Sequence, residues 1–134
     1  MAKIIDIEGI GESYAEKLKQ AGIPTTKKLL EQGASSKGRK DIAEKADISE
    51  KLILEWVNHA DLFRIKGVAS EYADLLEAAG VDTVVELAQR KPENLLEKMT
   101  LVNIEKKLVR KMPVISQVIN WVAQAKELPR VIVY

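Results

Sequence analysis

Two short glycine-containing segments have the residue types and the spacing that could bind a phosphate group. Gly9-Ile10-Gly11 and Gly67-Val68-Ala69 each stand before an apolar periodicity typical of a helix. Glycine lets the backbone turn tightly, and exposed amides at a helix start can donate hydrogen bonds to a phosphate oxygen. Because such bonds ignore base identity, both segments predict contacts with a nucleic-acid backbone without sequence recognition.

The charges around the two segments have opposite signs. Three carboxylates flank the first segment and would repel a phosphate: Asp6, Glu8 and Glu12. Two cations, Arg64 and Lys66, flank the second segment, although Ala69 replaces its second glycine. The candidate nucleic-acid-binding residues are therefore first Arg64, Lys66, Gly67, Val68 and Ala69, and then Gly9, Ile10 and Gly11.

A third candidate is a group of cations in the second half of the chain. The spacing predicts one broad helix face that carries Lys106, Lys107, Arg110 and Lys111, with Ile104, Leu108 and Met112 on the opposite face. Four cations in this arrangement could follow a row of phosphates, but a charged face is more commonly solvent cover. A smaller cluster, Lys37-Gly38-Arg39-Lys40, is diluted by neighbouring acids.

The two glycine segments belong to an internal repeat. At an offset of 58 residues, the block 7–30 shares nine identities with the block 65–88. Trp56 and Trp121 correspond at an offset of 65, so the second copy has about seven extra residues, which we place between Glu93 and Val118. We expect both tryptophans to anchor cores. The sequence predicts two domains, 1–62 and 63–134.

Helical periodicity dominates both copies and predicts an all-α fold. The first helix of each copy should end at Gly22 or Gly80, and Thr25 and Thr83 should cap the next helices. In the first copy, further helices are expected over residues 36–46 and from Ser49 to about residue 60.

The residues that signal helix starts and ends are less regular in the second copy. Pro92 suits a first helical position, Asn103 a helix cap, and Pro113 a break before a helix that ends near Lys126. The tail, residues 129–134, is expected to be extended and could pair with residues 3–7.

The repeat resembles a known domain. The residues that carry the resemblance are Gly9-Ile10-Gly11, Ala15-Glu16-Lys17-Leu18, Ala21-Gly22-Ile23, Thr25 and a degenerate second hairpin, Ala46-Asp47-Ile48-Ser49-Glu50. Each copy is similar to the amino-terminal helix-hairpin-helix domain of strand-exchange recombinases. The doubled chain resembles an uncharacterised bacterial family of tandem helix-hairpin-helix proteins.

The resemblance implies two SAM-like helical repeats and binding to the backbone of double-stranded or branched DNA. Some helix-hairpin-helix domains serve only as protein contacts, so fold alone does not decide between the two roles. Binding hairpins of this kind often have a cation two residues past the second glycine, where this chain has Ser13.

Composition excludes several other classes of protein. With 21 basic and 20 acidic residues, the chain has a formal net charge of +1, so bulk positive charge cannot drive binding to nucleic acid. There is no cysteine, and no apolar run approaches the ~20 residues of a membrane span, so we expect a cytoplasmic protein. His59, the single histidine, lies near Asp61 without a nucleophile or a second imidazole. We expect no enzyme activity, cofactor or metal.

A second role uses the same charges without nucleic acid. The acidic and basic hairpins could pair within the chain or head to tail between chains, as part of a protein-interaction or assembly module. Leu75 replaces the charged Lys17 of the first copy and could mark such a contact, or it could widen the core face of its helix. The sequence alone leaves both roles open.

Overall fold

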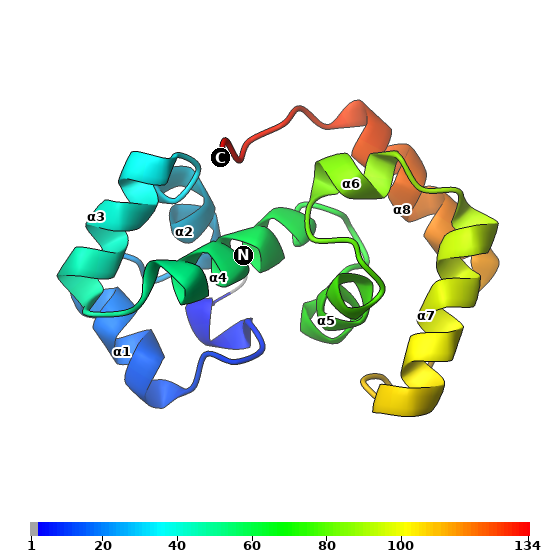
Figure 1. Cartoon of the computed structure of the whole chain (residues 1–134), viewed down its shortest axis with the longest axis horizontal. Coiled ribbons are helices and arrows are strands. Elements are labelled where there is room, and N and C mark those ends of the chain that lie inside the picture. Colours follow the sequence, from blue (N-terminus) through cyan, green and yellow to red (C-terminus); the bar gives the residue numbers. More distant parts are fainter. Residues whose placement is uncertain (1–2) are drawn as a thin grey trace. The chain divides into compact units, whose positions relative to one another are not determined.

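A computed structural model describes residues 3–134, and all the regular elements formed by these residues are helices (Figure 1). The only β-type pairing within these residues is one isolated antiparallel bridge between Lys3 and Thr25. The predicted all-α class is therefore confirmed. The elements in chain order are η1 (Ile4–Asp6), α1 (Glu12–Gln20), α2 (Thr26–Gln32), α3 (Ser36–Ala46), α4 (Glu50–Leu62), α5 (Ser70–Ala78), α6 (Val84–Ala88), α7 (Pro92–Lys106) and α8 (Ile115–Glu127).

The chain divides into two compact units. Unit 1 comprises the residues up to Asp61 together with Val131–Tyr134, and unit 2 comprises Leu62–Arg130. The division falls before the last residue of α4, one residue before the expected boundary. The tail differs from the expectation, because its last four residues belong with unit 1 instead of the second repeat.

Arg39 anchors the tail in unit 1, together with the buried Ile132 of the tail itself. Its side chain is 6% exposed, and its guanidinium donates to the carbonyls of Gly33, Ala34 and Val133 over 2.9, 3.1 and 3.0 Å. The Val133 amide in turn donates to the Ala34 carbonyl over 2.7 Å. A buried guanidinium has five donors to satisfy, and three backbone carbonyls supply acceptors.

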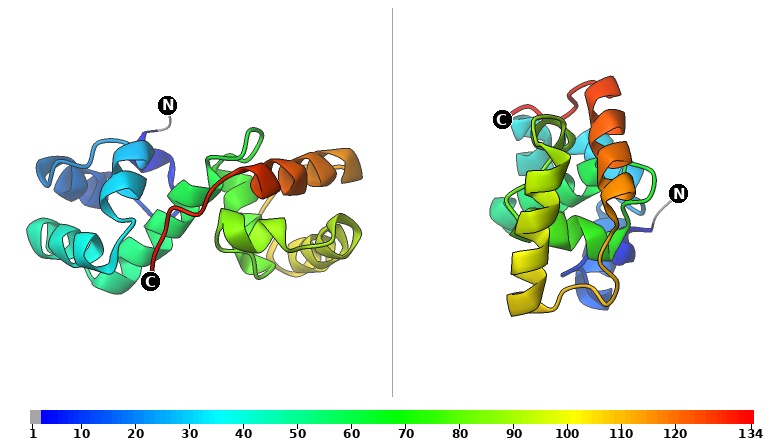
Figure 2. Two further views of the ribbon diagram at one scale, coloured as in Figure 1. Left: turned by 90° about the horizontal axis from the view of Figure 1, so that it is seen from above. Right: turned by 90° about the vertical axis from the view of Figure 1, so that its right-hand side faces the viewer.

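The predicted pairing of the tail with residues 3–7 is therefore wrong. The tail has no helical turns, as Figure 2 shows, and it contacts the segment before α3. Residues 4–6 form the 3-10 turn η1, which cannot offer a strand edge, and Lys3 bridges to Thr25 instead.

The ends of the first helices are alike in the two repeats. Gly22 and Gly80 follow α1 and α5 with φ of 87° and 94°, a region that glycine enters without steric cost. Thr25 and Thr83 then cap α2 and α6, since their side chains accept the amides of Lys28 and Glu86. These predicted stops and caps are confirmed, as are the helix at 36–46 and the Ser49 cap, which accepts the Leu52 amide.

The cores of the two units use the same aromatic pair. Trp56 and Trp121 are buried, as predicted, and each lies against a tyrosine of the first helix, with ring centroids 5.1 Å apart for Tyr14–Trp56 and 5.2 Å for Tyr72–Trp121. Leu75 is fully buried within the core of unit 2. The interpretation of Leu75 as a wider core face is therefore the right one.

The extra residues of the second copy lengthen one helix and the loop after it. Helix α3 has 11 residues and is followed by residues 47–49, whereas α7 has 15 and is followed by residues 107–114. Both helices end on a residue in the left-handed region, Asp47 at φ 56° and Lys107 at φ 52°. The insertion thus lies between Glu93 and Val118, as predicted.

Asn103 does not cap a helix start, so that prediction is wrong. It lies inside α7, and its side chain holds the following loop through two bonds, Nδ2 to the Val109 carbonyl at 3.1 Å and the Val109 amide to Oδ1 at 3.0 Å. Pro92 does occupy the first turn of α7, and α8 begins after Pro113 at Ile115.

Candidate functional site

The two glycine segments form hairpins with nearly the same backbone. We call residues 7–11 the first hairpin and residues 65–69 the second hairpin. Gly9 and Gly67 have φ of 92° and 97°. The residues that precede the helices are extended, Gly11 at φ −88° and ψ −174° and Ala69 at φ −102° and ψ −172°. Replacing the second glycine by alanine therefore leaves the hairpin unchanged, because this position needs no positive φ.

A buried residue fixes the centre of each hairpin. Ile10 and Val68 are both buried, and their amides donate back to Ile7 and Ile65, over 3.1 Å in each case. Their side chains therefore serve the core, and only their backbone could meet a ligand.

The start of the following helix is the part of each hairpin that could bind an anion. The first bond within α1 runs from the Ala15 amide to the Gly11 carbonyl and within α5 from Ala73 to Ala69, each over 2.9 Å. The amides of the first three residues of each helix point out of the helix start. Gly11 and Ala69 have no side-chain acceptor that could cap them.

Arg64 has a structural contact within unit 2. It is half-buried, and its guanidinium donates to the Pro129 carbonyl over 3.0 Å, so it holds the segment after α8 against the second hairpin. Its contact with a phosphate stays a prediction.

Lys66 combines an exposed side chain with a fully engaged backbone. The side chain of Gln124, in α8, makes two hydrogen bonds with the Lys66 backbone. The Lys66 amide donates to Gln124 Oε1 over 2.9 Å, and Gln124 Nε2 donates to the Lys66 carbonyl over 3.1 Å. The Lys66 amide is thus not available to a phosphate, whereas its ammonium is. Sequence reasoning missed this clamp; the signal was the offset of 65, which aligns Gln124 with His59.

The four cations of the second repeat do not share a helix face, so that prediction is wrong. Lys106 ends α7, Lys107 is in the left-handed conformation that stops it, and Arg110 and Lys111 lie in the loop. Leu108 and Met112 pack against the core of unit 2, but Ile104 is exposed. We call residues 106–111 the basic loop.

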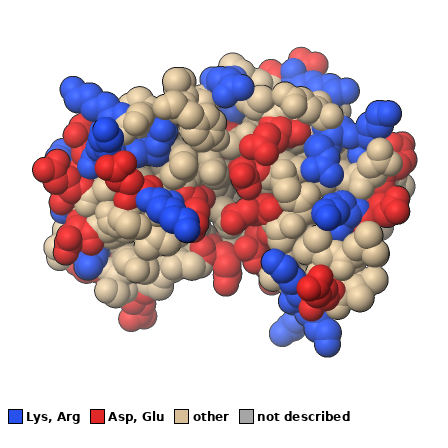
Figure 3. All heavy atoms as spheres, viewed as in Figure 1, with Lys and Arg blue, Asp and Glu red and all other residues tan. Residues whose placement is uncertain are grey.

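One hydrogen bond joins the basic loop to α5, the helix that follows the second hairpin. The hydroxyl of Tyr72, in the first turn of α5, donates to the Lys111 carbonyl over 3.1 Å. All four cations of the loop are exposed. Figure 3 shows basic side chains gathered around an acidic one over the free end of α7. Folding thus brings together two of the sites that the sequence predicted separately.

The cationic candidates in unit 1 are not arranged for binding phosphate. Arg39 of the 37–40 cluster is buried on the tail carbonyls described above. At the first hairpin, Asp6 accepts the Lys3 amide over 2.9 Å, while Glu8 and Glu12 are exposed beside Gly9 and Gly11. The exposed charge around this hairpin is therefore negative.

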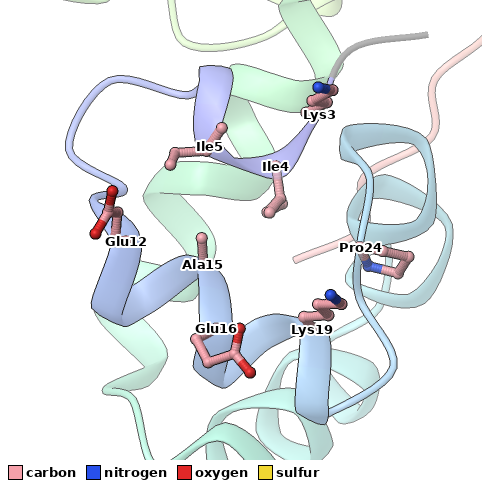
Figure 4. Close-up of a pocket in the computed structure, with 8 residues that line it drawn as sticks. All are labelled: Lys3, Ile4, Ile5, Glu12, Ala15, Glu16, Lys19 and Pro24. Atoms are coloured by element: carbon pink, nitrogen blue, oxygen red, sulfur yellow. The ribbon is translucent and has the colours of Figure 1, made fainter.

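Unit 1 does contain an apolar groove (Figure 4). Its volume is about 620 Å³, within the ~300–1,000 Å³ typical of ligand pockets. Figure 4 shows one helix, α1, facing η1 and the segment after α1 across the groove. The lining residues are Lys3, Ile4, Ile5, Glu12, Ala15, Glu16, Lys19 and Pro24.

His59 and Asp61 are both buried. Among residues 3–134, no group of three or more histidine, cysteine or carboxylate side chains is placed to hold a metal ion. Within the same residues, no helix combines the length and the apolar character that crossing a bilayer requires.

The fold and this site define a doubled all-α protein with one acidic and one basic hairpin. The chain belongs to the family described as Domain of unknown function (DUF4332), whose model matches residues 8–128 and so includes both hairpins and the basic loop. No curated protein and no solved structure matches the chain.

Proposed function

We propose that this protein is a non-enzymatic helix-hairpin-helix module whose unit 2 makes weak, sequence-independent contacts with the backbone of DNA. The observation that carries the proposal is the Tyr72–Lys111 hydrogen bond, because it holds the basic loop beside the start of α5. Uncapped helix-start amides and exposed cations are the two kinds of group that suit a phosphate oxygen.

The ligand contacts come from three sets of groups. The amides of Ser70, Glu71 and Tyr72 supply hydrogen bonds at the start of α5. The exposed Lys66 side chain supplies charge at the second hairpin. Lys106, Lys107, Arg110 and Lys111 extend the positive surface from there along the basic loop. Gly67, Val68 and Ala69 shape the hairpin rather than bind.

The charge distribution explains why contact should be confined to unit 2. Residues 1–62 contain 10 basic and 11 acidic side chains, and residues 63–134 contain 11 basic and 9 acidic ones. This difference is small, but three acids flank the first hairpin, whereas the second hairpin has the exposed Lys66 and one acid, Glu71, in the first turn of α5. Only a handful of cations can meet phosphate, so we expect weak binding with a shallow salt dependence.

Fluorescence anisotropy of labelled duplex and junction DNA over a salt series tests the proposal. We expect binding at low salt, and Lys66→Glu and Lys111→Glu should each weaken it several-fold and reduce the slope of log K against log salt by about one. Lys45→Glu, an equal change of charge at an exposed position of α3, is the matched control and should lower affinity much less. Absence of binding at low salt, or equal effects of all three changes, would reject the proposal.

A role in protein contacts is the second candidate, and a separate observation favours it. Several large apolar side chains are exposed on α7 and α8 of unit 2. A phosphate backbone offers no apolar surface to contact them, whereas another protein does.

A further inference from the structure

The end of α7 and the start of α8 expose a group of apolar side chains. Of the eight large hydrophobic side chains that are exposed in residues 3–134, five lie in this region, with Ile104 at 70% and Leu101 at 59%. Large exposed apolar side chains that gather in one region mark interaction sites in soluble proteins. We call these five side chains the apolar patch: Leu101, Ile104, Val114, Ile115 and Ile119.

The apolar patch lies at one end of the α7–α8 pair. Leu101 and Ile104 are one turn apart near the end of α7, while Val114, Ile115 and Ile119 start α8 directly after the loop. The core of unit 2 is closed beneath them by Leu95, Met99, Val109 and Val118, which are all buried. The exposed side chains therefore do not serve the core of their own unit.

The first repeat has no equivalent of this patch. Helix α3 ends on the buried Ala46, and the short segment 47–49 leads directly into α4. The patch lies on and next to the extra residues of the second copy, which also supply the basic loop. The insertion thus adds an apolar surface with a positive border.

A complementary surface exists on unit 1. The groove of Figure 4 has aliphatic walls, formed by Ile4, Ala15 and Pro24, and Ile5 beside them is 43% exposed. Glu12 and Glu16 stand along its α1 side, and Lys3 and Lys19 lie at its other end. The exposed Glu8 adds a third carboxylate at the adjoining first hairpin.

The two surfaces match in both character and charge. The groove can accept aliphatic side chains such as Leu101 and Ile104, and its acidic side is opposite in sign to Lys106 and Lys107 next to them. Two exposed acids of α7 lie beside them, Glu97 and Glu105, and both have Lys3 and Lys19 as potential partners in the groove. Opposite charges at the border of an apolar contact fix its orientation and disfavour other pairings.

We propose that the apolar patch of one molecule docks into the unit 1 groove of a second copy of this chain. The two surfaces differ, so the contact is heterologous, and each molecule still offers one free patch and one free groove. Assembly is therefore head to tail, and the oligomers grow longer as the protein concentration rises. The contact area is small, so we expect dissociation constants in the micromolar range or weaker.

Sedimentation velocity of the full chain, without nucleic acid, tests the assembly. The weight-average sedimentation coefficient should rise continuously from low to high micromolar protein. Leu101→Gln with Ile104→Gln makes the two most exposed members of the patch polar without changing charge, and Ile5→Gln with Ala15→Gln fills the groove with polar groups. Each double variant should stay monomeric on its own. Val133→Gln, at an exposed position outside both surfaces, is the control and should assemble normally.

Mixing the two double variants tests the head-to-tail arrangement. An equimolar mixture should form dimers and nothing larger, because only one intact patch and one intact groove can meet. Should the groove variant fold poorly by circular dichroism, Glu12→Lys with Glu16→Lys, which alters only exposed side chains, replaces it.

Three results would overturn the proposal. The first is a full chain that stays monomeric at all concentrations. The second is assembly of the groove variant alone, which would mean that two patches contact each other. The third is an equimolar mixture of the two double variants that stays monomeric. The patch variant keeps every cation of unit 2, so its DNA affinity in the anisotropy experiment should be unchanged. The two proposals can thus fail separately.

Discussion

The two repeats share a hairpin but not its surroundings. The backbone angles of the hairpin glycines differ by only a few degrees, and the tryptophan–tyrosine pairs beneath them have nearly equal spacings. Around this common frame, the first repeat has acids and the second has a cation and a basic loop. The repeated residues therefore build the hairpin, while the residues that differ between the copies set the charge around it.

Two equivalent positions show how the copies diverged in structure. The fourth residue of α3 is Arg39, and the fourth residue of α7 is Leu95; both are buried, but the arginine holds the tail and the leucine fills the core. At the end of the repeat, Gln124 grips the second hairpin through Lys66, where the first copy has the buried His59.

The largest effect is expected from making repeat 1 resemble repeat 2 at its buried arginine. Arg39→Leu leaves the carbonyls of Gly33, Ala34 and Val133 without their charged donor, which should lower the free energy of unfolding by about 2–4 kcal/mol. Urea denaturation measures the loss, and hydrogen exchange at the Val133 amide should accelerate because the tail is released.

Lys40→Leu is the matched control for this change, since Lys40 is the exposed neighbour of Arg39. Its effect should stay within about 0.5 kcal/mol. Equal stabilities of the two variants would show that Arg39 does not hold the tail.

The next effect separates the two glycines of a hairpin. Gly67→Ala forces alanine into φ 97° and puts its Cβ 3.0 Å from Trp121 Nε1, so it should cost about 1–3 kcal/mol. Gly11→Ala should be nearly neutral, because a Cβ there meets nothing within 4 Å and the second hairpin already has Ala69. Thermal unfolding compares the two; equal losses would contradict the shared hairpin geometry.

A smaller effect is expected at the clamp on the second hairpin. Gln124→Ala removes two hydrogen bonds to the Lys66 backbone at a half-buried position, with an expected cost of about 1–2 kcal/mol. Lys126→Ala, on an exposed face of the same helix, should change stability by less than about 0.5 kcal/mol. Denaturant titration of both variants checks the difference, and a neutral Gln124→Ala would mean that core packing alone sets the hairpin.

Much of the fold could be predicted because it depends on local signals. Glycines with positive φ, threonine caps and apolar spacing act within a few residues. The glycines predicted where α1 and α5 end, and the threonines predicted where α2 and α6 begin. The place of the insertion also followed from the shift of the repeat offset. These features need no knowledge of distant contacts.

The errors arose where a distant contact overrides a local pattern. Asn103 resembles a cap, but its bonds to Val109 close a loop instead, and this ends the helical spacing that the four cations seemed to share. Arg39 resembles part of a basic cluster until the tail, 94 residues further on, supplies its acceptor. The engagement of Arg64 by Pro129 and the grip of Gln124 on Lys66 are long-range contacts of the same kind.

We propose that nucleic acid contacts unit 2 at the start of α5, the second hairpin and the basic loop, and that it does not contact the first hairpin. A titration of duplex DNA into nitrogen-15-labelled protein, followed by amide chemical shifts at low salt, tests it residue by residue. We predict progressive shifts for Ser70, Glu71, Tyr72 and residues 106–111, with little change for residues 7–14. Shifts that centre on the first hairpin, or no shifts at all, would contradict the account.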